Sequence, residues 1–169
     1  MALGLAMVLA GCGSSTATGP ATSSSSTATS SSAASAAPRA PVKTATVSVK
    51  GTSETVLTTQ SGYTLYYFDK DTPTSSACTG SCASLWPPLL TGASTLSSPS
   101  GIPGTFTVVN DANGSQVEYQ GHLLYRYSGD TAPGQANGQG LFGFWWVATP
   151  SLSQAASSSS SSSGGGYGG

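Results

Sequence analysis

The ten residues GYTLYYFDKD at positions 62–71 decide the fold, because a second version of them, GHLLYRYSGD, follows at positions 121–130. At an offset of 59 residues the two stretches share glycine, leucine, tyrosine and aspartate, and a tryptophan follows each stretch at the same offset. The matched pairs are Gly62 and Gly121, Leu65 and Leu124, Tyr66 and Tyr125, Asp71 and Asp130, and Trp86 and Trp145. This self-similarity indicates a duplication, with residues 46–90 as the first repeat and residues 105–149 as the second.

Each repeat begins with a pattern that is typical of a β-hairpin. Residues 46–49 and 105–109 are rich in β-branched side chains and alternate in polarity, which favours strands over helices. The run Asn110–Gly114 is rich in turn-forming residues, so residues 116–119 can pair back on the strand before it. In the first repeat, residues 50–54 take the place of that turn.

The remainder of each repeat also favours strands. A third strand is expected at residues 65–68 and 124–127, and a fourth around each tryptophan, most clearly at residues 141–148. No helical period of useful length is present, so about eight strands account for the two repeats. We therefore expect an all-β fold, a small antiparallel sandwich or barrel of about four strands per repeat, with a pseudo-two-fold axis between the repeats.

The N-terminus carries the features of an export signal. Residues 1–10 are almost wholly apolar and end in Leu9-Ala10-Gly11-Cys12. That quartet resembles the bacterial lipobox, in which the cysteine is lipidated and becomes the first residue of the mature protein. We predict a signal peptide at residues 1–11 and lipidation at Cys12. No Lys or Arg precedes the apolar run, which fits a start site placed too late.

Low-complexity segments flank the repeats on both sides. Residues 12–45 are dominated by Ser, Thr and Ala, and residues 151–169 by Ser and Gly, so neither can bury enough apolar surface to fold. After a lipid anchor, the first segment is expected to be a flexible tether, with an end-to-end distance of roughly 30 Å. The second is expected to be a disordered tail.

The low charge of the chain excludes one class of function. Of its 169 residues only 7% are charged, and five Lys and Arg against six Asp and Glu give a formal net charge of −1. Five basic residues are too few for the basic surface that a charge-driven nucleic-acid binder needs. We therefore expect no nucleic-acid partner.

The motifs of the repeats carry a family resemblance. The paired Gly-x-x-Leu-Tyr-x-aromatic-x-x-Asp, the segment Cys78–Pro88 and the segment Asp130–Trp146 together resemble the bacterial family of secreted-repeat lipoproteins of unknown function, with its Tyr-x4-Asp motif. Thr64 and Leu123 stand where many members have proline. The resemblance implies an extracytoplasmic lipoprotein with tandem β repeats. It carries no established activity, so no catalytic residue can be transferred.

Two interpretations of the motif residues remain open from the sequence. Asp71 and Asp130 each follow a strand and precede a threonine, which favours a turn or cap; a ligand or ion contact is the alternative. Tyr66 and Tyr125 lie in the middle of strands and are expected to pack in the core, near the tryptophans, or to form an exposed aromatic platform for a ligand.

The remaining cysteines offer a structural and a chemical interpretation. With Cys12 assigned to the lipid, Cys78 and Cys82 form a pair in an oxidising compartment, which favours a disulfide around Gly80. A redox-active dithiol usually has two intervening residues at a helix start, and no helix is predicted here. Thiolates together with His122, the one histidine, would suit copper, although that chemistry is known from a different framework.

These observations favour a non-enzymatic lipoprotein on the bacterial cell membrane or envelope. No Ser-His-Asp arrangement is readable, and the letters of Gly138–Gly143 match a dinucleotide fingerprint without its helix. The expected partners are the membrane, through the lipid, and an envelope polymer or protein. We predict no cofactor. The alternative is an extracytoplasmic redox or copper-handling protein that uses Cys78, Cys82 and His122.

Overall fold

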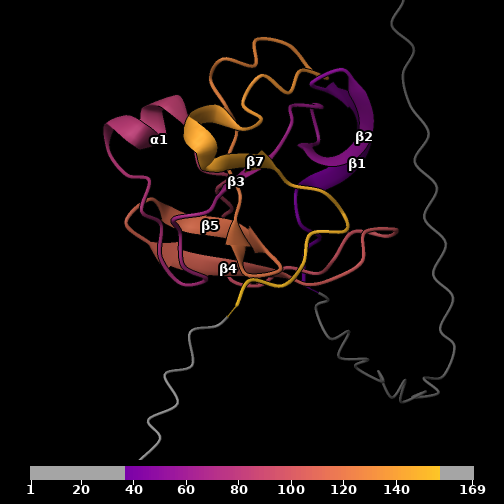
Figure 1. Cartoon of the computed structure of the whole chain (residues 1–169). Coiled ribbons are helices and arrows are strands. Elements are labelled where there is room, and N and C mark those ends of the chain that lie inside the picture. The colour runs from indigo at the N-terminus through magenta and orange to yellow at the C-terminus, as the bar shows by residue number, and fades with distance from the viewer. Residues whose placement is uncertain (1–36, 157–169) are drawn as a thin grey trace, which may run out of the picture. The chain divides into compact units, whose positions relative to one another are not determined.

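The computed structural model describes residues 37–156, which form short antiparallel strands with very little helix (Figure 1). The all-β prediction is therefore confirmed. The predicted signal peptide, Cys12 and most of the tether and tail lie outside the described residues. No helix within residues 37–156 has the length and apolarity needed to cross a bilayer. The elements in chain order are β1 (Val42–Val49), β2 (Thr52–Thr59), β3 (Tyr66–Phe68), α1 (Ser81–Leu85), β4 (Phe106–Asp111), β5 (Gly114–Tyr119), β6 (His122–Leu123), the 3-10 turn η1 (Leu141–Gly143) and β7 (Trp145–Val147).

The strands form three small sheets: β1–β2, β3–β7 and β4–β5–β6. The sheet β3–β7 joins a strand of the first repeat to a strand of the second, with Tyr66 opposite Val147 and Phe68 opposite Trp145. It is hydrogen-bonded to the first hairpin through the Leu57 N–H, which donates to the Ala148 carbonyl at 2.7 Å. In Figure 1 it is drawn between the two hairpins.

Both predicted hairpins are present, and the first has a tighter turn than expected. Val49 pairs with Thr52, so only Lys50 and Gly51 form the turn, with φ of 49° and 88°. A two-residue turn with positive φ at both residues has a twist that matches the twist of the two paired strands. Glycine adopts a positive φ at no steric cost. Residues 52–54, predicted as turn, therefore belong to β2. The second turn lies within the predicted run, because Asp111 pairs with Gly114.

The folded part extends beyond the predicted boundaries at both ends. β1 begins at Val42, and Ala40 and Val42 are buried, so the last residues assigned to the tether belong to the fold. The Ala40 N–H donates to the Ser97 carbonyl at 3.0 Å. After the second repeat, the Ala155 N–H donates to the Gln120 carbonyl at 2.8 Å. The sequence alone assigns Ala40, Val42 and Ala155 to the linkers because single apolar residues cannot be distinguished from the Ser, Thr and Ala around them.

Six of the eight expected strands are formed, and the unpredicted β6 brings the number within residues 37–156 to seven. Residues 124–127 form no strand, although Tyr125 makes isolated bridges to Tyr66 and Pro88. In the first repeat the short helix α1 lies where the fourth strand was expected, and Pro87 and Pro88 after it have no N–H for a ladder. In the second repeat β7 forms, but η1 replaces its first residues.

The buried residues form two clusters, and the repeat motif contributes to both. Leu65 and Leu124 belong to the first cluster, whereas Tyr66 and Tyr125 belong to the second. Neighbouring residues on an extended chain point to opposite sides, so each Leu-Tyr pair connects the two clusters. The first cluster also contains Phe106, Val117 and Tyr119, and the second contains Val47, Val56, Cys78, Trp86 and Trp145.

We predict that Leu65→Ala destabilises the protein by about 2–5 kcal/mol, because it leaves a cavity at a fully buried position. Leu124→Ala should have a similar effect, since Leu124 occupies the matching place in the other repeat. Leu90→Ala is the control, because that side chain is 47% exposed. Denaturant unfolding measures all three, and equal losses for Leu65→Ala and Leu90→Ala would contradict the assignment.

Candidate functional site

Two pairs of matched residues, the tyrosines and the tryptophans, contact each other across the two repeats. The Tyr66 N–H donates to the Tyr125 carbonyl and the Tyr125 N–H donates to the Tyr66 carbonyl, both at 2.9 Å. The rings of Trp86 and Trp145 are stacked with their centroids 3.7 Å apart and an interplanar angle of 1°. The two repeats are therefore joined at matching residues, and the two Tyr66–Tyr125 hydrogen bonds are reciprocal.

The tyrosines and aspartates are exchanged between the repeats. The Tyr66 hydroxyl donates to Oδ2 of Asp130 at 2.6 Å, and the Tyr125 hydroxyl donates to Oδ2 of Asp71 at 2.7 Å. Each tyrosine is thus held by the aspartate of the other repeat. The sequence placed each aspartate five residues after its own tyrosine and did not indicate this crossing.

Each aspartate also closes the loop that follows it, as the turn interpretation expected. Oδ1 of Asp71 accepts the Ala77 N–H at 2.8 Å, and Oδ1 of Asp130 accepts the Asn137 N–H at 2.9 Å. Asp71 bonds the sixth residue after it and Asp130 the seventh, so the loop closed by the second aspartate is one residue longer, although both tryptophans follow at the same offset. One carboxylate therefore orders a loop and fixes the opposite repeat at the same time.

The motif glycines allow close approach of other segments. Gly62 has φ of 91°, and a Cβ there would lie 3.1 Å from Cβ of Pro133. Gly121 has φ of 78°, and a Cβ there would lie 2.8 Å from Cβ of Ala155. Any other residue would strain the backbone at both positions, with a tight contact to Pro133 at position 62 and a steric conflict with Ala155 at position 121.

Burial changes the acidity of this cluster. Burial raises the pKa of Asp71 to about 6, although the hydrogen bonds from Tyr125 and from the Ala77 N–H lower it in part; the neighbouring Asp111 raises it further. Burial, followed by the bond to Asp130, raises the pKa of Tyr66 well above its ordinary range. Burial also raises the pKa of Tyr125, so both phenols remain protonated and act as hydrogen-bond donors.

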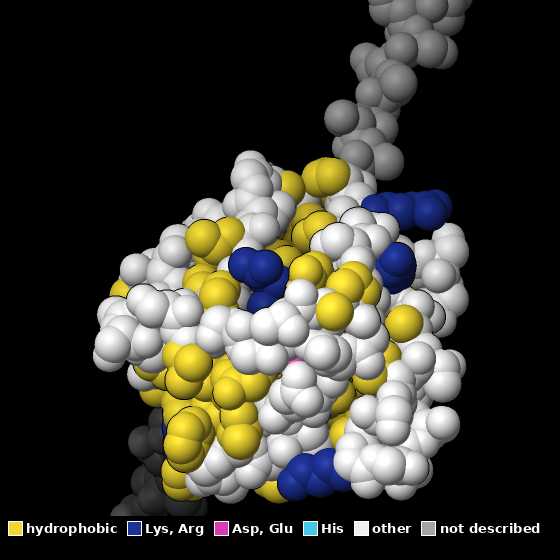
Figure 2. All heavy atoms as spheres, turned by 90° about the horizontal axis from the view of Figure 1, so that it is seen from above, with side chains coloured by type: hydrophobic (Ala, Val, Ile, Leu, Met, Phe, Trp, Pro, Cys, Tyr) yellow, Lys and Arg dark blue, Asp and Glu magenta, His cyan; other side chains and the backbone are white. Residues whose placement is uncertain are grey.

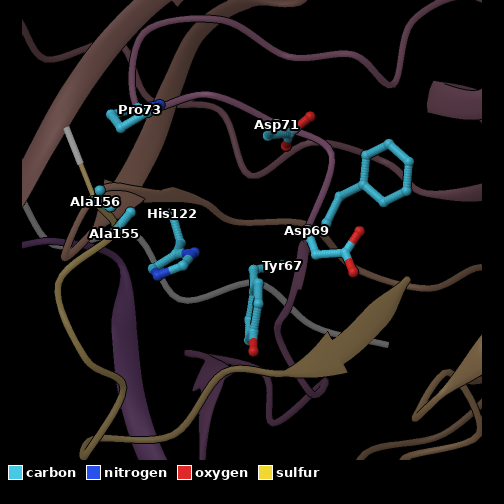
Figure 3. A pocket seen from close by; sticks show the side chains of 9 residues that line it. Tyr67, Asp69, Asp71, Pro73, His122, Ala155 and Ala156 are labelled. Carbon is cyan, nitrogen blue, oxygen red and sulfur yellow. The ribbon is translucent and has the colours of Figure 1, made fainter. Parts of the chain in front are cut away.

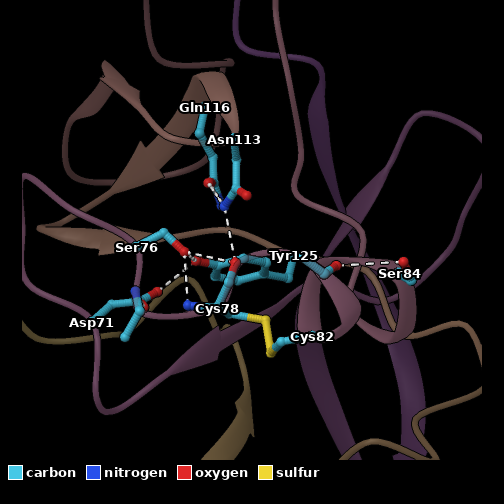
Figure 4. Close-up of a disulfide and its surroundings, with 10 residues drawn as sticks. Asp71, Ser76, Cys78, Cys82, Ser84, Asn113, Gln116 and Tyr125 are labelled. Carbon is cyan, nitrogen blue, oxygen red and sulfur yellow. Dashed lines mark hydrogen bonds between the residues drawn. A yellow bond between two sulfur atoms is a disulfide. The ribbon is translucent and has the colours of Figure 1, made fainter.

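The disulfide between Cys78 and Cys82 is present, as predicted, with a Cα–Cα distance of 5.2 Å. Figure 4 shows it beside the contact between Tyr125 and Asp71. The Cys78 N–H donates to Oγ of Ser76 at 3.0 Å, and that oxygen lies 2.7 Å from the Tyr125 hydroxyl. The disulfide loop is therefore hydrogen-bonded to one of the two exchanged pairs.

The other exchanged pair has glycine in the corresponding place. The Gly138 N–H donates to the Tyr66 hydroxyl at 3.2 Å. A Cβ at Gly138 would lie 2.8 Å from ring atoms of Tyr66 and of Trp86. A cysteine would not fit there. The disulfide is thus particular to the first repeat, and at the 59-residue offset the second repeat has Asn137 and Leu141 in place of the two cysteines.

His122 lies in a different part of the domain from the disulfide. Its ring centroid is 4.7 Å from that of Tyr67, and its Nε2 lies 3.1 Å from the Ser153 carbonyl oxygen. Burial lowers the pKa of His122, against the opposing effects of Ser153 and Glu118. Within residues 37–156, no three His, Cys, Asp or Glu side chains are grouped so that they could hold a metal ion. Cys78, Cys82 and His122 are therefore not brought together as a copper site.

His122 lines a pocket of about 240 Å³. Figure 3 shows the rings of Tyr67 and His122 beside each other, tilted by 55°, with Ala155 and Ala156 close to His122. The sequence missed this pocket, because it depends on residues after the second repeat that were assigned to the tail. The lining residues are Tyr67, Phe68, Asp69, Asp71, Pro73, Gly121, His122, Ala155 and Ala156.

The repeats identify the class of protein. Residues 47–90 and 107–149 match the model of a family described as a secreted repeat of unknown function. The two matches cover about half of the chain, and the chain belongs to this family. The resemblance stated from the motifs is confirmed, and an extracytoplasmic location follows from the description of the family. No curated protein and no solved structure matches the chain.

We predict that the Asp71 carboxyl titrates near pH 6 in the folded protein, above the ordinary 3.8. Its contribution to stability is then fully present below pH 3.8 and is lost as the pH rises through about 6. Tyr125→Phe removes a hydrogen bond that lowers this pKa, so it should move the titration of Asp71 upward. Carbon-detected NMR of the carboxyl measures both midpoints.

Tyr66→Phe is the matched control, since Tyr66 binds Asp130 and not Asp71. It should leave the Asp71 midpoint unchanged, while either variant costs about 1.5–3 kcal/mol of stability through the lost hydrogen bond to a carboxylate. A downward shift in Tyr125→Phe, or equal shifts in both variants, would refute the crossed pairing.

Proposed function

We propose that this chain is an envelope-anchored lipoprotein, held by a lipid on Cys12, whose two-repeat domain is a non-catalytic binding or structural module. One observation carries the non-catalytic part of the proposal. The polar groups of the repeat motif are bonded to each other across the repeats, Tyr66 with Asp130 and Tyr125 with Asp71. The motif residues therefore stabilise the fold, and a binding partner would contact other residues on the surface.

The anchoring part is supported by the sequence before the domain. An apolar run that ends in Leu-Ala-Gly-Cys precedes a long segment of Ser, Thr and Ala, and the family is described as secreted. A diacylated cysteine contributes about 0.8 kcal/mol per buried methylene, and two or more chains hold a protein stably at a bilayer. The domain would then be displayed at the end of the tether.

The anchor is tested by Cys12→Ser in the full chain, expressed in a bacterium with its native export route. The parent should incorporate labelled fatty acid and remain with the membrane fraction, whereas Cys12→Ser should do neither. The double variant Cys78→Ser with Cys82→Ser is the control, and it should still be labelled. Membrane retention and labelling of Cys12→Ser would contradict the proposal.

The redox alternative is judged on the accessibility of the disulfide. Cys78 is fully buried and Cys82 is half-buried, so a reductant reaches the bond poorly in the folded state. We predict that mild reductant opens the bond only when denaturant unfolds the protein. The bond closes a loop of about five residues, which corresponds to about 2 kcal/mol of stability in the chain-entropy description.

Thiol titration with and without denaturant measures this difference, and unfolding of the double serine variant measures the stability. Rapid reduction of the Cys78–Cys82 bond in the native protein by a substrate dithiol, which is itself oxidised to a disulfide, would favour the redox function instead.

A further inference from the structure

We propose that the loop Gly140–Phe144, with Lys50 and Lys70 beside it, is a docking surface for a bilayer that contains anionic lipids. This proposal rests on the proposed lipid anchor in one respect only: the anchor raises the local concentration of the domain at the membrane. Its evidence comes from the exposure of the loop, its backbone and the distribution of charge on the domain.

The loop exposes an aromatic ring at a cost in backbone energy. The Phe142 side chain is 71% exposed, and its φ of 55° lies in the left-handed region that is unfavourable for a side chain of this kind. Core packing gives no reason for this conformation, since the ring faces solvent. Backbone strain clusters at functional sites, and exposed apolar patches mark interaction surfaces.

The loop is fixed on the core by its neighbours. Leu141 packs against the second core cluster, and Phe144, which is 39% exposed, makes an edge contact with Phe68 at 6.4 Å between centroids. Phe68 is in turn stacked on Trp145 at 4.5 Å. The exposed rings of Phe142 and Phe144 therefore project from a rigid support.

Two lysines flank this loop. Lys70 places its Nζ over the Phe144 ring, 4.4 Å from the centroid, and also pairs with Asp69 at 3.5 Å on the surface. Nζ of Lys50 is 3.0 Å from the position that a Cβ on Gly140 would occupy. Because exposed ion pairs contribute little, the pairing with Asp69 leaves Lys70 available to an anion.

Within residues 37–156 the basic side chains are more exposed than the acidic ones, of which Asp69 alone is exposed. All five Lys and Arg are exposed, whereas four of the six carboxylates accept hydrogen bonds from the domain itself. These four are Asp71, Asp111, Glu118 and Asp130. Figure 2 shows hydrophobic and basic side chains on one face, on which Asp and Glu are barely visible.

Exposed aromatic rings bordered by lysines match an anionic bilayer surface. The rings would enter the boundary between headgroups and acyl chains, and the lysines would meet the lipid phosphates. Two lysines give weak binding, and a tether with a span of roughly 30 Å keeps the domain close enough for a weak contact to be occupied.

The test uses sedimentation with vesicles and the chain from residue 13 onward, so that neither a lipid on Cys12 nor the apolar residues 1–10 contribute to binding. The chain should bind vesicles of phosphatidylcholine with phosphatidylglycerol, and more weakly at higher salt. It should bind vesicles of phosphatidylcholine alone poorly. Lys50→Ala and Lys70→Ala should each weaken binding about fivefold, which corresponds to about 1 kcal/mol per lysine. Lys43→Ala is the matched control, because Lys43 is exposed on β1 seven residues before Lys50.

Phe142→Gly separates binding from folding. Glycine accepts the left-handed backbone, so stability should be kept or raised while vesicle binding falls. Unchanged binding in Phe142→Gly, no binding to anionic vesicles, or equal binding to both vesicles would overturn the proposal. Binding to soluble polyphosphate that is indifferent to Phe142→Gly, without vesicle binding, would also overturn it. Because the chain is unlipidated, these outcomes are independent of whether Cys12 is acylated in the cell.

Discussion

Two phenol hydroxyls, on Tyr66 and Tyr125, each donate a hydrogen bond to the aspartate of the opposite repeat. The rest of the domain depends on this exchange. The same carboxylates order the loops after them, and Trp86 of the first repeat is stacked on Trp145 of the second. A buried hydrogen bond to a carboxylate is expensive to leave unmade, so each repeat needs the other for its own polar groups to be satisfied. The two repeats therefore form one cooperative unit and not two small domains.

The duplication, the hairpins and the disulfide could be predicted from the sequence, because each follows from local chemistry or from a constant offset. The crossing of Tyr66 to Asp130 could not, since a repeat shows which residues correspond but not which copy they contact. The helix α1 was missed because five residues carry no period, and the bounds of the domain were missed because Ala40 and Ala155 look like the linkers around them.

The distribution of charge on the surface also could not be predicted from the sequence alone. The formal net charge of −1 counts every carboxylate as if it faced solvent. In the fold, Asp111 caps the second hairpin turn and Glu118 accepts a hydrogen bond from Thr107, so the scaffold uses oxygens of both carboxylates although they keep their charge. Which carboxylates are free to contact a partner therefore depends on the hydrogen bonds of the scaffold, and composition alone does not contain that information.

The hydrogen bonds between Tyr66 and Tyr125 join two halves of one chain, and this affects how the sequences of the two halves can diverge. A single repeat could satisfy its tyrosine and aspartate only by associating with a second copy, and that association would weaken on dilution. Residues 91–104 connect the halves covalently, so the pairing no longer depends on protein concentration. Once the halves are joined, they are also free to differ. One half carries a disulfide where the other has Gly138, and the aromatic loop with Phe142 occurs in the second half alone. A symmetric dimer of identical chains would have to carry both features twice or not at all.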